Sequence, residues 1–444
     1  MFSVCCGSCS ASPKNTPVSP AIIPQAKRLV QPKTATREPA PGIRKMNMSR
    51  LILFALLAFT LAGALAKPAQ AREPEVIRFG VCIPLSGSFQ YLGHTNLAGI
   101  KLRLDDINEH SDETGIRLEM LLRDNESNPQ RSADIVDEFA DMGLSIIIGP
   151  CTTDVIFAMI PRARARGVVL LSPSVSMIDI HKRSDGWAFR VMFGDDHQAV
   201  ALAKFAVDDL KLLRAAAIVN TRFLFGNSIY IPFSQAYEHL GGEVLKAERY
   251  QWDLNYNTPH DFTGILARIK AIQPEVILVP GFAEEASQII HQSQSVGIQA
   301  RFLGGDGWFS SEVILASGNN LEGSYFLGGR DTKSTIPEMQ HFNDLLDRSF
   351  DPAAEPASMH GYDCVTLTAE AAKAGARTGE EIRNWLFSLK NYRLVCGDVT
   401  FDRETGNDIT LYLHKISHEN DSFISTVVSE YHPEELRMII AGRK

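Results

Sequence analysis

Beyond residue 71 the sequence lacks the short motifs that would indicate a familiar enzyme. It contains no Gly-x-Ser-x-Gly nucleophile motif, no phosphate-binding loop, no dinucleotide fingerprint and no His/carboxylate metal motif. Its histidines are scattered: His94, His197, His260 and His360 share no spacing typical of metal ligands. We therefore expect a protein that is not an enzyme and that needs no metal or cofactor.

The sequence also lacks an apolar run long enough for a membrane-spanning helix, which needs ~20 residues. The apolar stretch 51–65 is shorter, follows a basic start at residues 46–50, and is closed by the small residues of segment 66–71. This order of a basic start, an apolar stretch and an A-x-A site is typical of a secretory signal peptide.

The signal peptide would occupy residues 46–71, with cleavage after Ala71 and a mature chain that begins at Arg72. Cleavage after Ala66 is the competing possibility. Residues 1–45, rich in Pro, Ser, Ala and basic residues, are expected to be a leader or a mis-assigned start. No cysteine follows the apolar run directly, so we expect a periplasmic protein without a lipid anchor.

Basic residues are scarce in the mature chain. The sequence has 44 Lys+Arg and 52 Asp+Glu, of which residues 1–71 hold 9 and 1. The remainder carries 35 basic and 51 acidic residues, a net charge of −16. So negative a charge argues against nucleic acid or an anionic membrane as a partner.

Few cysteines remain after processing, namely Cys82, Cys151, Cys364 and Cys396. Their long, irregular spacing does not match a zinc site. Export makes disulfides possible, and the pairs Cys82–Cys151 and Cys364–Cys396 are the candidates. Buried free thiols are the alternative, and the sequence leaves this choice open.

From residue 72 onward, short apolar runs typical of buried strands alternate with amphipathic helices. The expected strands are 76–83, 116–120, 145–148, 168–171, 215–219, 244–250, 276–279 and 301–303. After residue 328 we expect helices at 339–350, 362–374 and 379–389 and strands at 399–401 and 409–413. The alternation predicts α/β architecture with parallel sheets covered on both faces, and its restart near residue 200 predicts two lobes. Ligands of such sheets bind at the carboxyl ends of strands.

Several short stretches carry a resemblance to a known family. They are IPLSG (83–87), GIK to DIN (99–108), DNESNP (124–129), IGP (148–150), LSPS (171–174), FLGGDG (302–307), GYD (361–363) and GDVTFD (397–402). In this order and behind a signal peptide, they resemble the leucine/isoleucine/valine-binding family of periplasmic receptors. The resemblance extends from about residue 76 to residue 413.

The resemblance implies the type I fold of these receptors, in which two Rossmann-like lobes with parallel sheets are joined by three crossovers. The first lobe would comprise residues 72–194 and 328–394, and the second lobe residues 195–327 and 395–444. Such receptors close on a small molecule and deliver it to a membrane permease without a cofactor.

Two loops of the first lobe are expected to hold the ligand. Thr153 lies where a strand gives way to a helix, and the free N–H groups of a helix N-terminus suit a carboxylate. The resemblance implies that the Thr153 hydroxyl contacts the ligand's α-carboxylate, and it places a main-chain contact at Ser174 and a hydroxyl contact at Ser176. The alternatives are that Thr152 or Thr153 only caps its helix and that the serine loop is a plain turn.

The second lobe is expected to supply the opposite charge. Asp306 lies in a glycine-rich segment after a strand, and the resemblance aligns it with the acidic residue that pairs with the ligand's ammonium. A plain Asp-containing turn is the alternative interpretation.

Aromatic residues complete the expected site. Phe225 and Phe282 stand where the family commonly has tyrosine, and Tyr91 lies one place from the usual tyrosine of the first loop. Phe89 and Trp308 are expected at the side-chain end of the ligand. Each alone is more often a core residue, but as a set they indicate an apolar ligand side chain.

We therefore expect the substrate-binding protein of an ABC transporter, a monomer that binds a branched-chain or other apolar amino acid and interacts with a membrane permease. A sensor of the same fold for amides or amino acids is the alternative, and a scaffold without a small ligand is a further one. Leucine-like and aromatic amino acids, and amides, all fit the pattern.

Overall fold

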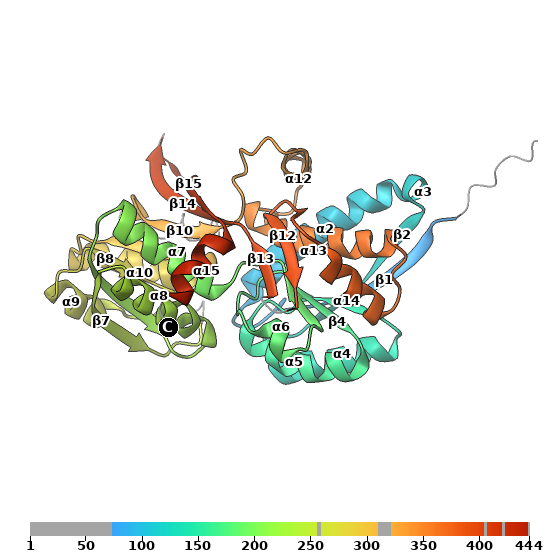
Figure 1. The fold of residues 1–444 in the computed structure, drawn as a ribbon, viewed down its shortest axis with the longest axis horizontal. Helices are drawn as coiled ribbons and strands as arrows, with labels where there is room; N and C mark the ends of the chain where they lie inside the picture. The colour runs from blue at the N-terminus through green and yellow to red at the C-terminus, as the bar shows by residue number, and fades with distance from the viewer. Residues whose placement is uncertain (1–72, 255–258, 310–320, 404–405, 420–421, 443–444) are drawn as a thin grey trace, which may run out of the picture. The chain divides into compact units, whose positions relative to one another are not determined.

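The computed structural model describes residues 73–254, 259–309, 321–403, 406–419 and 422–442 (Figure 1). The expected signal peptide and its cleavage site after Ala71 lie outside the described residues. Among the helices that are described, none is both long and apolar enough to cross a membrane.

The first lobe is built on a five-stranded parallel sheet of order β2–β1–β3–β4–β5. Its strands are β1 (Glu75–Ile83), β2 (Ile116–Asp124), β3 (Ile146–Ile148), β4 (Val169–Ser172) and β5 (Ala188–Arg190). The helices between them are α2 (Gln90–Glu109), α3 (Ser111–Thr114), α4 (Pro129–Asp141), α5 (Thr153–Arg166) and α6 (Ile180–Arg183). Later in the chain follow α12 (Pro337–Arg348), α13 (Met359–Lys373) and α14 (Gly379–Ser388).

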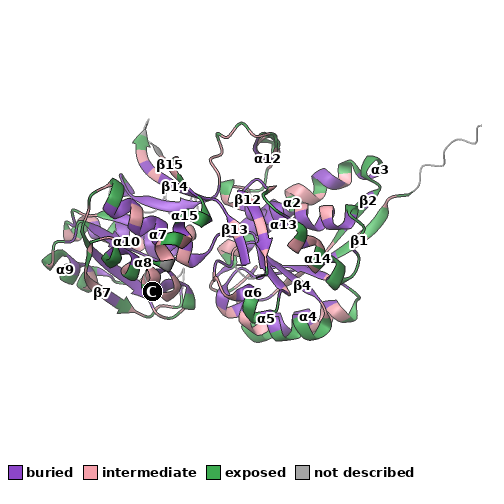
Figure 2. Cartoon of the chain, in the orientation of Figure 1, coloured by how far each residue is buried: buried purple, intermediate pink, exposed green. Residues whose placement is uncertain are grey.

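Both faces of this sheet are covered by helices, because successive strand residues point to opposite sides. Cys82 and Ile147 pack with α4 and α5 on one face. Val81 and Ile148 lie in the core cluster that includes α2 and α13 on the other face. Figure 1 shows the two sets of helices on the two sides of the sheet. Figure 2 shows that these helices are exposed on their outer sides and buried where they face the sheet.

The second lobe is built on a seven-stranded sheet of order β15–β14–β10–β9–β8–β6–β7. Its strands are β6 (Arg214–Asn220), β7 (Glu243–Tyr250), β8 (Val276–Leu278), β9 (Arg301–Gly304), β10 (Tyr325–Gly328), β14 (Leu411–Glu419) and β15 (Ser422–Tyr431). Its helices are α7 (Asp195–Lys204), which continues as a π-helical turn (Phe205–Asp209), α8 (Leu224–His239), α9 (Thr263–Ala271), α10 (Ala283–Val296) and α15 (Pro433–Ala441).

The second sheet departs from the expected parallel arrangement at one edge. Strand β14 pairs antiparallel with β10, and β15 pairs antiparallel with β14. Only residues 420 and 421 separate β14 from β15, whereas a parallel crossover needs a dozen or more residues. The short connection therefore imposes the antiparallel hairpin, which the sequence pattern did not indicate.

A small three-stranded sheet precedes the last crossover. It consists of β11 (Tyr392–Arg393), β12 (Asp398–Asp402) and β13 (Gly406–Ile409). Strand β12 contacts α14, and β13 contacts β5 and α6, all elements of the first lobe. We therefore propose that the last crossover lies near residue 410 rather than after residue 394.

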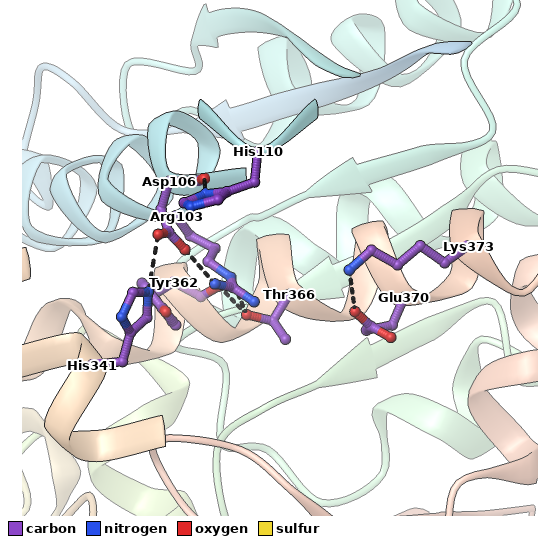
Figure 3. Close-up of polar contacts among 8 residues, drawn as sticks. All are labelled: Arg103, Asp106, His110, His341, Tyr362, Thr366, Glu370 and Lys373. Carbon is purple, nitrogen blue, oxygen red and sulfur yellow. Dashed lines mark hydrogen bonds and ion pairs between the residues drawn. The ribbon is translucent and has the colours of Figure 1, made fainter. Parts of the chain in front are cut away.

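Helix α2, whose N-terminal half borders the site described below, is fixed against α12 and α13 by polar contacts (Figure 3). Arg103 of α2 donates to Thr366 of α13 at 3.1 Å, and its guanidinium lies 5.0 Å from the centre of the Tyr362 ring. Asp106 binds Arg103 and, at 2.9 Å, His341 of α12.

The crossing of α2 and α13 also depends on glycine. A Cβ atom on Gly361 of α13 would lie 2.2 Å from the backbone oxygen of Asn96, and one on Gly99 of α2 would lie 1.9 Å from that of Ser358. Only glycine permits so close an approach. The crossing therefore sets the position of Asn96.

Candidate ligand-binding site

One cavity lies at the carboxyl ends of strands from both lobes, where an open α/β sheet binds its ligands. The space inside it is about 590 Å³ when the part open to solvent at its mouth is included. Its lining includes seven of the eight residues expected from the sequence, namely Tyr91, Thr153, Ser174, Ser176, Phe225, Phe282 and Asp306.

Thr152 and Thr153 stand at the N-terminus of helix α5, and both are buried in the cavity wall. The side chain of Thr152, the N-cap residue, makes no capping hydrogen bond. The Asp154 carboxyl bonds its own backbone N–H, and the other first-turn N–H groups keep capacity for an anionic ligand group, which the helix dipole also favours.

The serine loop after β4 is held in place by its own hydrogen bonds. The hydroxyl of Ser172 donates to the carbonyl of Pro150 at 2.6 Å and accepts the N–H of Ser174 at 3.4 Å. The carbonyl of Ser176 accepts the N–H of Asp195 at 3.0 Å, which joins this loop to the start of α7. These bonds present Ser174 and Ser176 to the cavity.

Asn96 of α2 also lines the cavity, although the sequence analysis did not single it out. Its amide nitrogen donates to the carbonyl of Leu92 and to the hydroxyl of Ser174, both at 2.8 Å. The only signal in the sequence was a polar residue one position before the apolar face that starts at Leu97.

Asp306 places a carboxyl group in the cavity wall. Its backbone N–H donates to the side chain of Gln198 at 2.8 Å, and its Oδ1 atom is buried without a hydrogen-bond partner among the described residues. Burial raises the pKa of the Asp306 carboxyl, and the negative charge of Asp195 raises it further. Among the described residues of the cavity wall there is no lysine or arginine. A cationic ligand group would therefore supply the positive charge that stabilises the ionised form of Asp306.

Arg190, at the end of β5, is a buried cation that interacts electrostatically with Asp195, Asp196, Asp408 and Asp306. It is 2% exposed, and its Nη1 atom donates to the carbonyl of Met192. Burial lowers the pKa of its guanidinium to about 10, although the charges of Asp196 and Asp195 oppose that shift. Arg190 therefore stays charged at neutral pH and balances carboxylates at the first crossover.

The aromatic wall is formed mainly by phenylalanines. The rings of Phe225 and Phe282 lie 4.8 Å apart, and Phe89 packs edge-on against Phe282 from behind, at 5.1 Å. Tyr91 lines the cavity and donates its hydroxyl to Glu355. The wall is therefore apolar, which suits an apolar ligand side chain.

Trp308 does not line the cavity, where the sequence led us to expect it. Its side chain is fully buried in the core of the second lobe, and its indole N–H donates to the carbonyl of Val279 at 3.1 Å. The short 3-10 turn Asp306–Trp308 leaves Asp306 at the cavity and directs the indole into the core. Phe309 lines the cavity instead.

Two further lining residues, Met192 and His360, were not anticipated. Burial lowers the pKa of the His360 imidazole to about 4. His360 is therefore neutral at physiological pH and does not supply the cation that an anionic ligand would require.

The structure decides between disulfides and buried free thiols, the choice that the sequence left open. All four are buried and none is in a disulfide. Burial raises the pKa of the Cys82 thiol to about 12, and it raises the pKa of the Cys151 thiol as well. These side chains are therefore inert core thiols at neutral pH.

A sequence model of the periplasmic binding protein family matches residues 76–412. The chain belongs to this family. It is similar to Leu/Ile/Val-binding protein homolog 1 of Brucella melitensis, at 23% identity over 326 residues that cover 73% of this chain and 86% of the relative. It is also similar to the Leu/Ile/Val-binding protein BraC3 of Rhizobium johnstonii, at 27% identity over 356 residues, 79% of this chain and 93% of the relative.

Solved structures of periplasmic binding proteins share the fold. The leucine-binding protein LivK of Thermotoga maritima matches with a TM-score of 0.71 at 20% identity, covering 81% of this chain and 99% of its own. The protein LivJ of Streptococcus pneumoniae, solved with isoleucine, matches with a TM-score of 0.70 at 25% identity, covering 80% and 99%. A solute-binding protein of R. palustris, solved with 4-hydroxybenzoate, also gives a TM-score of 0.70, at 20% identity, covering 81% and 97%.

These comparisons confirm the expected family and the two-lobed type I fold. The chain is a periplasmic binding protein that is similar to Leu/Ile/Val-binding proteins. Its solved neighbours hold amino acids in some cases and aromatic acids in others.

Proposed function

We propose that this protein is the substrate-binding component of an ABC importer and that its cavity takes an amino acid with an apolar side chain. The observation that carries the proposal is the division of the cavity wall between the lobes. The first lobe offers hydroxyls and helix N–H groups that suit a carboxylate. The second lobe offers one carboxylate, Asp306, beside an apolar wall.

The mechanism follows from this division. The ligand carboxylate would bind first at Thr153, Ser174 and Ser176 on the first lobe. Closure about the crossovers would then bring Asp306 to the ammonium and Phe225 and Phe282 to the side chain. The closed, loaded form would dock on the permease, with no cofactor, metal or covalent step.

The remaining features of the proposal concern export. The protein would act as a periplasmic monomer, released from residues 46–71 by cleavage after Ala71. Its net charge of −16 after cleavage supports a freely diffusing receptor rather than one that binds an anionic membrane or nucleic acid.

Apolar amino acids are expected to raise the melting temperature of the protein purified after expression of the full chain. A ligand at ~100 times its dissociation constant stabilises the folded state by ~2.7 kcal/mol, which a thermal-shift screen detects. The screen should include branched-chain and aromatic amino acids, short amides and benzoates. Stabilisation by benzoates alone would exclude amino acids as the ligand class, and stabilisation by nothing would favour a scaffold.

The affinity for an amino acid is expected to rise with pH across the neutral range. Burial and Asp195 raise the pKa of Asp306 in the ligand-free protein, so at lower pH the carboxyl must lose a proton before it can pair with ammonium. The dissociation constant should fall by up to about tenfold per pH unit while Asp306 is still protonated and the ligand ammonium keeps its charge. Calorimetry from pH 5 to 8 measures this slope, and Asp306→Asn should flatten it.

A further inference from the structure

The orientation of the Asn96 amide is determined by its neighbours. The backbone carbonyl of Leu92 can only accept, so the atom 2.8 Å from it must be the amide nitrogen. The second N–H of the same nitrogen points to the Ser174 hydroxyl, also at 2.8 Å. Both amide hydrogens are therefore used within the first lobe.

This orientation also fixes the role of Ser174. Its oxygen accepts from Asn96, so its own hydrogen can donate either to the neighbouring Cys151 sulfur or to a ligand. Ser174 lines the cavity beside the N-terminus of α5. Ser174 would therefore meet a ligand carboxylate as a hydrogen-bond donor.

The amide oxygen is the part of Asn96 that has no use in the protein. Asn96 is 3% exposed, and its Oδ1 atom has no hydrogen-bond partner among the described residues. A buried acceptor without a donor is destabilising, and a ligand that brings an N–H group would remove that cost. A carboxylic acid without an N–H group would leave the oxygen unsatisfied.

We infer that Asn96 is a specificity-determining residue that selects ligands with an ammonium or amide N–H over carboxylic acids of the same carbon skeleton. The inference rests on the proposed receptor function and narrows its ligand class. Asn96 on the first lobe and Asp306 on the second both line the cavity, and the ammonium would lie between the Asn96 amide oxygen and the Asp306 carboxylate. Recognition of nitrogen would thus be shared by the two lobes.

The test compares two ligand pairs that differ only in the amino group: L-leucine with 4-methylpentanoate, and L-phenylalanine with 3-phenylpropanoate. Calorimetry, with displacement for weak binders, is done on the unaltered protein and on Asn96→Ala and Asn96→Leu, the second of which keeps the side-chain volume. The variants should bind the amino acid about tenfold more weakly or worse, and the deaminated acid less than threefold more weakly. Loss of the Asn96 bond to Ser174 affects both members of a ligand pair, because both carry the carboxylate. The ratio of the two affinities therefore reports the contribution of the Asn96 amide oxygen.

Asn125→Ala is the matched control. Asn125 is a fully buried asparagine of the first lobe whose Oδ1 accepts the N–H of Ser127 at 3.0 Å, outside the cavity. Its loss should lower the melting temperature and leave the selectivity ratio unchanged. If an Asn96 variant binds amino acids with the same ratio of amino-acid to deaminated-acid affinity as the unaltered protein, the inference is overturned. The proposed receptor function is unaffected by that result. Failure of the unaltered protein to bind either amino acid overturns the proposed function itself.

Discussion

Replacing Asp306 by alanine is expected to weaken amino-acid binding by about 30-fold to several-thousand-fold. The carboxylate is buried, and its Oδ1 atom has no partner among the described residues. Its removal leaves the ligand ammonium desolvated and unpaired, and truncating one member of a buried charge pair typically costs about 2–5 kcal/mol. Calorimetry with L-leucine and L-phenylalanine measures the loss.

Two further variants make the Asp306 result specific. Asp306→Asn keeps the shape of the side chain and removes the charge, so it should lose most of the affinity as well. Asp261→Ala removes an exposed carboxylate of the second lobe whose Oδ1 accepts from Thr263, outside the cavity, and should leave binding unchanged. Equal affinity of Asp306→Ala and the unaltered protein would show that the ammonium is bound elsewhere.

Replacing Arg190 by methionine is expected to lower the free energy of unfolding by about 3–5 kcal/mol. The guanidinium is buried and favourably charged against Asp195, Asp196 and Asp408. Methionine fills a similar volume but removes the cation that faces the buried carboxylate of Asp195, and removing one partner of a buried charge cluster is costly. Urea denaturation of the ligand-free protein measures the difference.

The stability lost in the Arg190 variant is expected to depend on pH. Burial raises the pKa of the Asp195 carboxyl to about 6, and loss of the Arg190 charge, which holds that pKa down, raises it further, so the folded variant prefers Asp195 protonated. The loss of stability should therefore be larger at pH 8 than at pH 5. A loss that is the same at both pH values would indicate a packing defect instead of unpaired charge.

Arg78→Met is the comparison for the Arg190 variant. Arg78 lies on β1 and pairs with Glu119 at 3.1 Å, but its side chain is 62% exposed. Exposed ion pairs contribute ~0–1 kcal/mol. If Arg78→Met and Arg190→Met unfold at the same urea concentration, then Arg190 does not hold the crossover together.

Much of the site was predictable because parallel strands deliver their following loops to one edge of the sheet. Thr153, Ser174 and Ser176 follow β3 and β4, and Asp306 follows β9, so each stands at the carboxyl end of a strand, and the family resemblance singled these residues out within their loops. Trp308 was misplaced because it is only two residues from Asp306. A pattern of residue types does not say which way each side chain leaves a tight turn.

Asn96 was missed for a related reason. The periodicity of Leu97 and Ile100 predicted a buried helix face, but it did not say that the start of this helix borders the cavity. That depends on the approach of α13, where Gly361 contacts the backbone of Asn96. The contact joins segments 265 positions apart, so no local pattern carries it.

The sequence by itself determined the α/β alternation, the two lobes and the strand-end loops, because burial periodicity and loop position are local properties of the chain. It left three decisions to the tertiary structure. The antiparallel pairing of β14 with β10 joins two strands that are separated in the chain by the segment from α12 to β13. The free thiols depend on how the core positions each cysteine. The amide of Asn96 acquires its role only where α2, the serine loop and α13 meet, because a hydrogen-bond deficit exists only once all possible partners are in place.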